Sequence, residues 1–270
     1  MPRIFRLDRE DNAFQRAEVL RRNRTKRHHY RECFVEGVGP LNRLLDGGWR
    51  VMSLWGSYER EPSRWAAEFI ERSGSPLVYE LPQQLMDRLS ERDESTELVA
   101  LAEIPDRDLE AVEMDGRGPV LVLDRPGSPG NLGALIRSAD ALGAVAVVVS
   151  GHGVDPYDPQ TIRASRGSVF TLPVVAVRGP SHLGGWLAAQ NPRPRVVGTD
   201  SGGDAVLFDV NLSDPLVLIL GNEATGMSHG YGELCDVVAS IPLSGSADSL
   251  NVACAGSIAL YEVVRQRRKA

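Results

Sequence analysis

The chain has 270 residues, of which 42% are hydrophobic and 24% charged, a composition typical of a soluble α/β protein with one large or two smaller domains. No apolar run approaches the roughly 20 residues of a membrane-spanning helix, and the Arg-rich N-terminus lacks the apolar core of a secretion signal. Cys33, Cys235 and Cys254 form no CxxC pair, which argues against a zinc or disulfide framework and favours free thiols in the reducing cytoplasm.

The net charge of −6 is unevenly distributed, which matters for any interaction with nucleic acid. Residues 1–50 have a balance of +5, residues 51–116 of −10 and residues 117–270 of −1. The basic charge is concentrated in Arg21–Arg31, where six Lys or Arg and two His occur without an acidic residue. Such a cluster can contact the phosphates of RNA; the alternative is a solvated basic helix end. The candidate phosphate contacts are Arg24, Lys26 and Arg27.

The first part of the chain predicts a charged arm and a small α/β domain. Residues 1–11 have no apolar period and are expected to be a mobile arm, after which Asn12 can cap a helix over Ala13–Arg24. Strands and helices then alternate, as they do in α/β domains. The expected strands are Cys33–Val38, Val51–Gly56, Leu77–Leu81 and Leu98–Ile104, and the helices between them follow Pro40 and cover Arg64–Arg72 and Pro82–Leu89.

A longer α/β series follows the polar, acidic stretch Asp106–Gly118, which is expected to be a linker between a domain within residues 1–110 and a second within 117–270. Alternating strands and helices predict a parallel sheet covered on both faces. The expected strands are Val120–Asp124, Val145–Ser150, Leu172–Val177, Arg195–Thr199, Leu216–Leu220 and Val237–Leu243. The expected helices begin at Asn131 or cover Gln160–Arg166, Ser181–Gln190 and Leu250–Val264.

Two of these strands deliver polar loops that can hold a ligand. Leu216–Leu220 is followed by GNEATG, and Val237–Leu243 by a loop of Gly, Ser, Asp and Asn that leads into the final helix. Ligands of parallel α/β sheets bind at the carboxyl ends of strands, so these loops are expected to form one site. In the helix from Asn131, Arg137 lies off the apolar stripe and can face the same cleft. The glycines before that helix do not follow the G-x-G-x-x-G spacing, which disfavours a nicotinamide site.

Three stretches carry more specific information: DRPGSPGNLGALIRSADALGA at 124–144, GNEATG at 221–226 and SIPLSGSADSLNVACAGSIALYE at 240–262. In this order they resemble the motifs of the SpoU/TrmH family of S-adenosylmethionine-dependent RNA ribose 2′-O-methyltransferases. The resemblance implies a knotted parallel-sheet (SPOUT) methyltransferase domain, and the first domain resembles the ribosomal-protein-like substrate-binding domain of many family members. FVEGVGPLNRLLDGGW at 34–49 and DRPGSPGN at 124–131 are most similar to antibiotic-resistance 23S rRNA methyltransferases of the avilamycin type.

The resemblance implies roles for individual residues in methyl transfer. It places Arg137 at the reacting centre, either as the base or as the group that holds phosphate and stabilises charge on the 2′-oxygen; arginine is a poor base on ordinary grounds. Glu223 would orient Arg137 or cap a loop amide, and Ser249 can equally be a plain helix cap. Arg166 would position phosphate, although an arginine after a helix is more often a surface charge. The implied catalytic residues are Asn131, Arg137, Glu223, Ser249 and Asn251.

The implied cofactor is S-adenosylmethionine, and the chemistry requires no metal. Adenine is held by an apolar slot with backbone hydrogen bonds, which loops at strand ends can supply. The five His show no metal-ligand spacing. The implied cofactor-binding residues are Thr199, Leu220, Gly221, Ile241, Leu243 and Leu250.

We therefore expect a cytoplasmic enzyme that methylates a ribose 2′-hydroxyl of RNA, with 23S rRNA as its partner and antibiotic resistance as an extension. The final helix is apolar on every side, and a homodimer through the knotted domain, the habit of the family, would bury it. A tRNA 2′-O-methyltransferase is the alternative within the family; the N-terminal domain disfavours it, because minimal tRNA members lack that domain. A catalytically dead RNA-binding scaffold is the alternative outside it, and the intact motif residues argue against that.

Overall fold

The structure is a computed structural model that describes residues 2–90, 96–114 and 116–268. Its contacts divide the chain into two compact units. Unit 1 comprises the chain up to Asp106 together with Tyr157–Thr171, and unit 2 comprises Arg107–Pro156 together with the chain from Leu172 onwards. The sequence did not indicate that residues 157–171 group with the first half of the chain. No described helix is long and apolar enough to cross a membrane.

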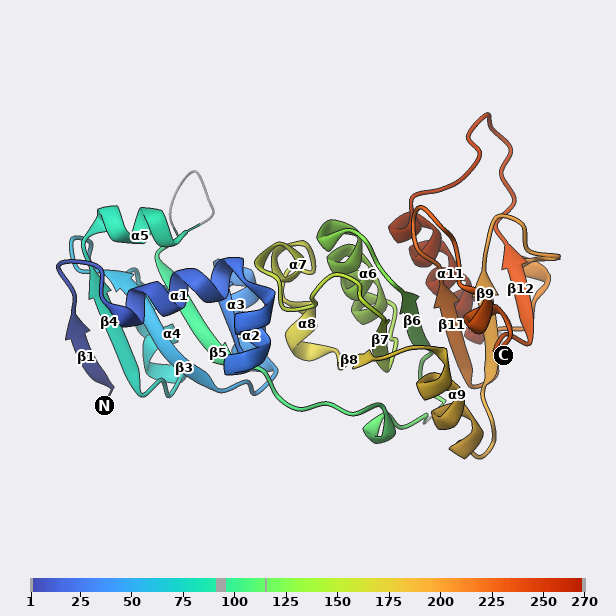
Figure 1. The fold of residues 1–270 in the computed structure, drawn as a ribbon, viewed down its shortest axis with the longest axis horizontal. Helices are drawn as coiled ribbons and strands as arrows, with labels where there is room; N and C mark the ends of the chain where they lie inside the picture. The colour runs from blue at the N-terminus through green and yellow to red at the C-terminus, as the bar shows by residue number, and fades with distance from the viewer. Residues whose placement is uncertain (1, 91–95, 115, 269–270) are drawn as a thin grey trace. The chain divides into compact units, whose positions relative to one another are not determined.

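Unit 1 is built on a five-stranded mixed sheet with the order β1-β4-β3-β5-β2. Figure 1 labels β1, β4, β3 and β5 of this sheet. Strand β5 is antiparallel to both of its neighbours, whereas the pairs of β4 with β3 and with β1 are parallel. The strands are β1 Arg3–Arg6, β2 Glu32–Glu36, β3 Val51–Ser57, β4 Leu77–Leu81 and β5 Leu98–Glu103. The helices are α1 Asn12–Arg22, α2 Arg24–Tyr30, α3 Val38–Asp46, α4 Arg64–Arg72 and α5 Gln83–Leu89, with α7 Pro159–Ala164 and α8 Ser168–Thr171 from the later segment.

Two expectations for the start of the chain are wrong. The expected mobile arm contains the edge strand β1, whose residues are exposed on both faces and pair with β4 through the backbone, so no apolar period marks it. The expected helix Ala13–Arg24 is two helices, because Asn23 adopts an extended conformation and its side chain accepts a hydrogen bond from the Lys26 amide at 3.1 Å. Asp11, not Asn12, caps the first of them, accepting from the Phe14 amide at 2.9 Å.

Unit 2 contains a seven-stranded parallel sheet with the order β10-β12-β9-β11-β6-β7-β8, as the alternation of strands and helices predicts. Strand β11 is inserted between β9 and β6, both of which precede it in the chain. Its five residues are buried, which explains the unbroken apolar run. The knot implied by the family resemblance remains a prediction. The strands are β6 Val120–Asp124, β7 Ala146–Ser150, β8 Val174–Val177, β9 Arg195–Thr199, β10 Ala205–Val206, β11 Leu216–Leu220 and β12 Val237–Ser240.

Helices α6 and α11 lie side by side in unit 2 (Figure 1). A Cβ added to Gly256 of α11 would lie 2.4 Å from Cδ2 of Leu135 and 2.5 Å from Cδ1 of Leu220, so glycine permits this close approach. The predicted linker is not a simple tether, because Leu109 is fully buried in the core of unit 2. The helices are α6 Pro129–Ala141, α9 Pro180–Ala189, α10 His229–Gly232 and α11 Val252–Arg267, with short 3-10 turns at Leu109–Ala111 and Leu207–Asp209.

Candidate active site

A cavity of about 460 Å³ opens at the carboxyl ends of β9, β11 and β12. This is the edge of a parallel sheet where strand ends and their loops converge on a ligand. Residues 199–201, 220–224 and 249–252 form most of the lining. The six residues expected to bind a cofactor all line this cavity, and so do four of the five expected catalytic residues: Asn131, Glu223, Ser249 and Asn251.

The apolar part of the cavity wall includes leucines that are unusually exposed. Leu220 at the end of β11 is buried, but Leu243 and Leu250 in the loop before α11 are 40% and 37% exposed. Ile241 and Ala255 extend the same wall. Apolar side chains around a cavity of this size, with polar loop groups at its rim, are the usual composition of a small-molecule site.

The loop 221–226 forms one wall and is a tight, self-bonded turn. The backbones of Asn222 and Gly226 exchange two hydrogen bonds of 3.0 Å, and the Asn222 side-chain oxygen accepts from the amides of Ala224 and Thr225. A Cβ at Gly221 would lie 2.3 Å from the Met227 nitrogen, so only glycine fits there. The turn therefore presents the backbone around Gly221 to the cavity in one conformation.

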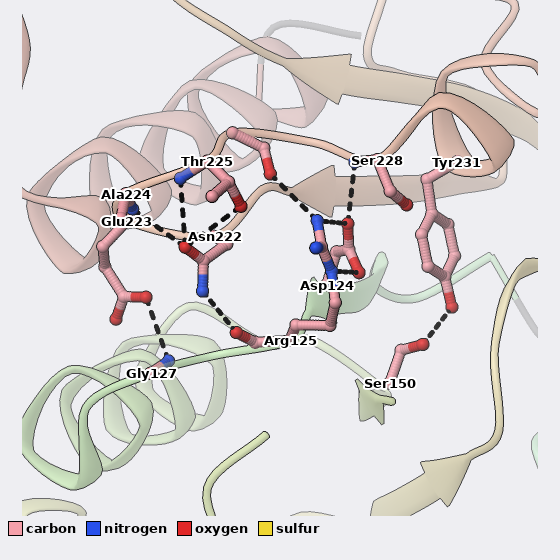
Figure 2. Close-up of polar contacts among 11 residues, drawn as sticks. Asp124, Arg125, Gly127, Ser150, Asn222, Glu223, Ala224, Thr225, Ser228 and Tyr231 are labelled. Carbon is pink, nitrogen blue, oxygen red and sulfur yellow. Dashed lines mark hydrogen bonds and ion pairs between the residues drawn. The ribbon is translucent and has the colours of Figure 1, made fainter. Parts of the chain in front are cut away.

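A buried carboxylate ties this turn to the end of β6 (Figure 2). Asp124 is 2% exposed, and it accepts hydrogen bonds from Nε of Arg125 at 2.9 Å and from the Ser228 amide at 2.8 Å. Burial raises the pKa of Asp124, but the hydrogen bonds from Arg125 and Ser228 outweigh it and hold the pKa below its ordinary value. The Asn222 side chain adds a bond to the Arg125 carbonyl at 2.6 Å. The carboxylate thus fixes the turn against the strand in its charged form.

Three polar side chains from three separate motifs form a connected chain of hydrogen bonds at the rim. The side-chain nitrogen Nδ2 of Asn131 donates to Oε1 of Glu223 at 3.1 Å. The side-chain oxygen Oδ1 of Asn131 accepts from Nδ2 of Asn251 at 3.1 Å. The Asn251 oxygen in turn accepts from the Ala253 amide at 2.8 Å, at the start of α11. The side-chain amides of Asn131 and Asn251 each donate through nitrogen and accept through oxygen. If either side chain were flipped by 180°, these hydrogen bonds would be lost, so each has a single orientation.

Glu223 is the charged end of this chain. It also accepts from the Gly127 amide at 3.0 Å, as Figure 2 shows. Burial would raise the pKa of Glu223, but the hydrogen bonds from Asn131 and from the amides of Gly127 and Ser128 lower it. Glu223 is therefore a charged carboxylate that holds the loop before α6 in place. Of the two roles expected for it, this contact matches the capping of a loop amide.

Neither Asn131, the expected start of its helix, nor Ser249, for which a helix cap was the alternative role, is an N-cap. Asn131 is not the N-cap of α6; Ser128 is, and Asn131 lies in the first turn, from which its side chain reaches Glu223. Ser249 is not the N-cap of α11; Asn251 is, and its side-chain oxygen accepts from the backbone amides of Ala253 and Cys254. In α6, Pro129 occupies the first helical position directly after the Ser128 cap, which is a common way to begin a helix. Both observed caps lie within three residues of the expected helix starts.

Among the described residues, Arg137 is the one expected catalytic residue that does not line the cavity. It is exposed on α6, and its neighbour Ser138 shares a hydrogen bond of 2.8 Å with Ser257 of α11. Asp200 and Ser201, by contrast, line the cavity and were not expected there. Their position directly after the predicted strand Arg195–Thr199 was the signal that could have found them.

The four basic residues expected to contact RNA all belong to unit 1, but their side chains differ in exposure. Arg24 and Lys26 are exposed on α2. Arg27 is 1% exposed; its guanidinium donates to the Leu20 carbonyl at 3.0 Å and pairs with Asp158 at 2.9 Å. We therefore leave Arg27 out of the proposed RNA contacts. Arg166 is exposed between α7 and α8, in a left-handed conformation with φ of 51°.

Comparison with known sequences identifies the class of protein that this fold and cavity define. The profile of the SpoU rRNA methylase family matches residues 118–261, and the profile of the SpoU L30e-like domain matches residues 11–100. The chain belongs to the SpoU rRNA methylase family. It is similar to the 23S rRNA (uridine(2479)-2′-O)-methyltransferase of Streptomyces viridochromogenes, with 39% identity over 98% of this chain and 94% of that protein.

Solved structures agree with this assignment. The SpoU methyltransferase AviRb from Streptomyces viridochromogenes, in complex with AdoMet, matches with a TM-score of 0.91 and 39% identity over 97% of this chain and 100% of that one. The AdoMet-bound rRNA methyltransferase from Sinorhizobium meliloti matches with a TM-score of 0.87 and 28% identity over 97% and 98%. The predicted family, the SpoU/SPOUT fold class with its L30e-like first domain, and the enzyme class of RNA ribose 2′-O-methyltransferase are confirmed.

Proposed function

We propose that the protein transfers a methyl group from S-adenosylmethionine to a ribose 2′-hydroxyl of 23S rRNA. The observation that carries the proposal is the cavity at the ends of β9, β11 and β12, whose lining joins the expected cofactor residues to the Glu223–Asn131–Asn251 chain. The relative from Streptomyces viridochromogenes, which matches over nearly the whole chain, is named for this reaction.

The residues present fit the cofactor. Leu220, Leu243 and Leu250 would cover the adenine ring, and the backbone at Gly221, fixed by the turn 221–226, would supply the hydrogen bonds at its edge. S-adenosylmethionine, when bound, supplies a sulfonium methyl group that is open to attack. The exposed leucines would become buried on binding, which favours association of the apolar ring.

The chain's own residues would align and activate the ribose. In the transfer, the 2′-oxygen would bond to the methyl carbon as the bond from sulfur to that carbon breaks, and the hydroxyl proton would be released to solvent water. We assign Arg137 to holding the neighbouring phosphate and stabilising the developing charge on the 2′-oxygen, because guanidinium groups remain protonated in proteins. The Glu223–Asn131–Asn251 chain would hold α6, which carries Arg137, and the start of α11 in register.

The proposed partners are RNA and a second copy of the chain. Arg24 and Lys26 would contact RNA phosphates, and Arg166 would position the phosphate next to the target ribose. Ile258 and Tyr261 of α11 are 43% and 61% exposed, and a homodimer through this helix would bury them. The proposed action on ribosomal RNA would require a cytoplasmic enzyme, and the avilamycin-type sequence resemblance extends the proposal to antibiotic resistance.

The decisive test is to incubate the protein with tritium-labelled S-adenosylmethionine and, separately, 23S rRNA and tRNA, and to map the labelled nucleotide. We expect label on one ribose of 23S rRNA, resistant to alkaline hydrolysis at that linkage because the 2′-hydroxyl is blocked. Label on tRNA alone would select the tRNA enzyme. Cofactor binding without label on any RNA would select the catalytically dead scaffold.

A further inference from the structure

The segment Tyr157–Thr171 has an unexpected place in the molecule. It lies in the chain between β7 and β8, which are neighbours in the sheet of unit 2, but its contacts place it in unit 1. The chain therefore passes between the units at three points: 106–107, 156–157 and 171–172. Arg166, which the proposed function assigns to the phosphate, is carried by this segment.

Trp49 holds both ends of the segment. Its indole Nε1 donates a buried hydrogen bond of 2.8 Å to the Phe170 carbonyl. Its ring packs edge to face with Phe170, at a centroid distance of 4.9 Å, and with Tyr157, at 5.7 Å. Since Tyr157 and Phe170 bracket the segment, one side chain fixes the entry and the exit of the chain at the same place.

The backbone of the segment lies so close to the rest of unit 1 that a side chain would not fit at Gly47 or at Gly167. A Cβ on Gly47 would lie 2.1 Å from the Phe170 carbonyl oxygen, and a Cβ on Gly167 would lie 2.8 Å from Cα of Pro40. Gly167 also has a φ of +88°, which only glycine adopts readily. The segment therefore packs directly against α3 and the glycine that follows it.

A buried charge completes the attachment. The Arg27 side chain is 2% exposed and pairs with Asp158 at 2.9 Å while it donates to the Leu20 and Arg21 carbonyls at the end of α1. A guanidinium that satisfies helix carbonyls on one side and a carboxylate on the other links the basic helices to the start of α7. The same helices carry Arg24 and Lys26.

Arg166 itself stands at the exposed apex of this attached segment. Its amide donates to the Arg163 carbonyl at 2.9 Å, and the Gly167 amide donates to Ile162 at 3.1 Å, so the turn between α7 and α8 is closed. The residues on either side, Ser165 and Gly167, are buried. The backbone at Arg166 is thus fixed, and the side chain is directed to solvent.

We propose that Trp49 is a positioning residue for methyl transfer, because it holds the segment that presents Arg166 as part of the RNA-binding unit. This inference rests on the proposed function of Arg166. The unit that contacts the RNA backbone would then also supply the arginine that places the target phosphate, so binding and alignment would come from the same unit. Trp49 touches no substrate and acts through the segment.

The test uses the full-length protein and the variant Trp49→Phe, which keeps an aromatic ring but removes the indole N–H. The matched control is Trp55→Phe in the same unit: Trp55 is also buried, but its Nε1 donates to Ser53 at 3.0 Å and its ring stacks on Tyr79. Trypsin cleavage after Arg163 and Arg166 reports release of the segment. We expect cleavage there to be faster by about tenfold in Trp49→Phe, because loss of the buried bond favours local opening, and unchanged in Trp55→Phe.

The functional arm is a double-mutant cycle in methyl transfer to RNA. Trp49→Phe should lower kcat/KM for RNA by about tenfold with unchanged cofactor affinity, because a small displacement of a positioning group is costly. In an Arg166→Ala background, Trp49→Phe should have no further effect. Additive losses, an equal loss in Trp55→Phe, or unchanged trypsin cleavage would overturn the proposal. Absence of methyl transfer in the unmodified enzyme would refute the proposed function instead, and the trypsin result would still report whether Trp49 holds the segment.

Discussion

The strand-end cavity of unit 2 and the basic stretch Arg21–Arg31 of unit 1 were both singled out from residue types, but they differ in how the structure treats them. At the cavity, loops that are distant in sequence meet because parallel strands end at one edge of a sheet. In the basic stretch, neighbouring residues point in different directions: Arg24 is exposed and Arg27 is buried. Backbone topology determines the first arrangement, whereas helical phase and a break at Asn23 determine the second.

The difference teaches which sequence signals carry positional information. The carboxyl end of a parallel strand fixes the edge of the sheet at which the following polar loop lies, whatever its side chains do. A run of charges fixes only the composition of a surface, because long side chains can turn inward when they find partners. Arg21 and Arg27 do so by donating to backbone carbonyls, Arg21 to those of Leu89 and Ser90 and Arg27 to that of Leu20.

The largest expected effect concerns Arg137, the one expected catalytic residue outside the cavity lining. We predict that Arg137→Ala lowers kcat for methyl transfer by about 100- to 1000-fold, as loss of one stabiliser of an oxyanion does. Cofactor affinity, measured by calorimetry, should stay within a few-fold, because Arg137 does not line the cavity. Arg137→Lys should recover only part of the rate, since a lysine keeps the charge but not the planar fork. An unchanged rate in Arg137→Ala would remove this residue from the mechanism.

The buried carboxylate Asp124 gives the next largest effect, and it depends on pH. Its folded pKa lies below the unfolded value of about 3.9. Its stabilising contribution is therefore fully present above that value and is lost as the pH falls through the folded pKa. Asp124→Asn should lower the free energy of unfolding at pH 7 by about 1.5–3 kcal/mol, because it weakens hydrogen bonds to a charged group. Denaturant titrations should show the gap between the two proteins closing below about pH 4; a constant gap would contradict the assignment.

Close packing behind the cavity is tested by Gly256→Ala in α11. The added methyl would lie 2.4 Å from Leu135 and 2.5 Å from Leu220, and such overpacking should cost about 1–3 kcal/mol of unfolding free energy. The matched control is Gly185→Ala in α9, where no atom of the described residues lies within 4 Å of the added Cβ. That substitution should stabilise the protein by about 0.5–1 kcal/mol, because alanine is the better helix former. Equal Tm shifts of the same sign would show that the two sites are not distinguished by packing.

The smallest expected effect is on the salt dependence of RNA binding, which should differ between variants of exposed and of buried cations in the basic stretch. Replacing Arg24 and Lys26 with alanine should weaken RNA binding and reduce the slope of log Kd against log salt by about 0.7 for each phosphate that the variant no longer neutralises. Arg27→Gln removes the charge and keeps an amide donor, but on a shorter side chain than the guanidinium that bonds the Leu20 and Arg21 carbonyls. It should leave the slope unchanged while lowering the melting temperature. A reduced slope in Arg27→Gln would mean that its charge reaches the RNA after all.

Much of the fold was predictable because central parallel strands are buried on both faces. The expected bounds of β6, β9 and β11 agree with the structure to the residue. The features that the sequence did not predict share a physical cause, since each depends on tertiary context. Strand β1 has no buried face, and the helix break at Asn23 depends on its side chain capping the next helix. The attachment of residues 157–171 to unit 1 depends on Trp49 and Gly47, which lie more than a hundred residues earlier.

The cavity residues were within reach of the sequence for a different reason. Asn131, Glu223 and Asn251 are polar residues in loops or first helical turns, where no core packing demands them. That they bond to one another was not predictable, because it requires the register of α6 against α11. Residues such as Asp200 were missed because a single polar residue after a strand is common and belongs to no motif.

The place of β11 between β9 and β6 has a consequence for the order in which the protein matures. All but one of the cavity-lining residues come after position 198, and the central strand has to find two partners that are already synthesised. The basic helices of unit 1 therefore emerge from the ribosome long before the cavity has walls. A nascent chain would therefore acquire the proposed RNA-contacting surface first and the proposed cofactor site last, when α11 has closed against α6.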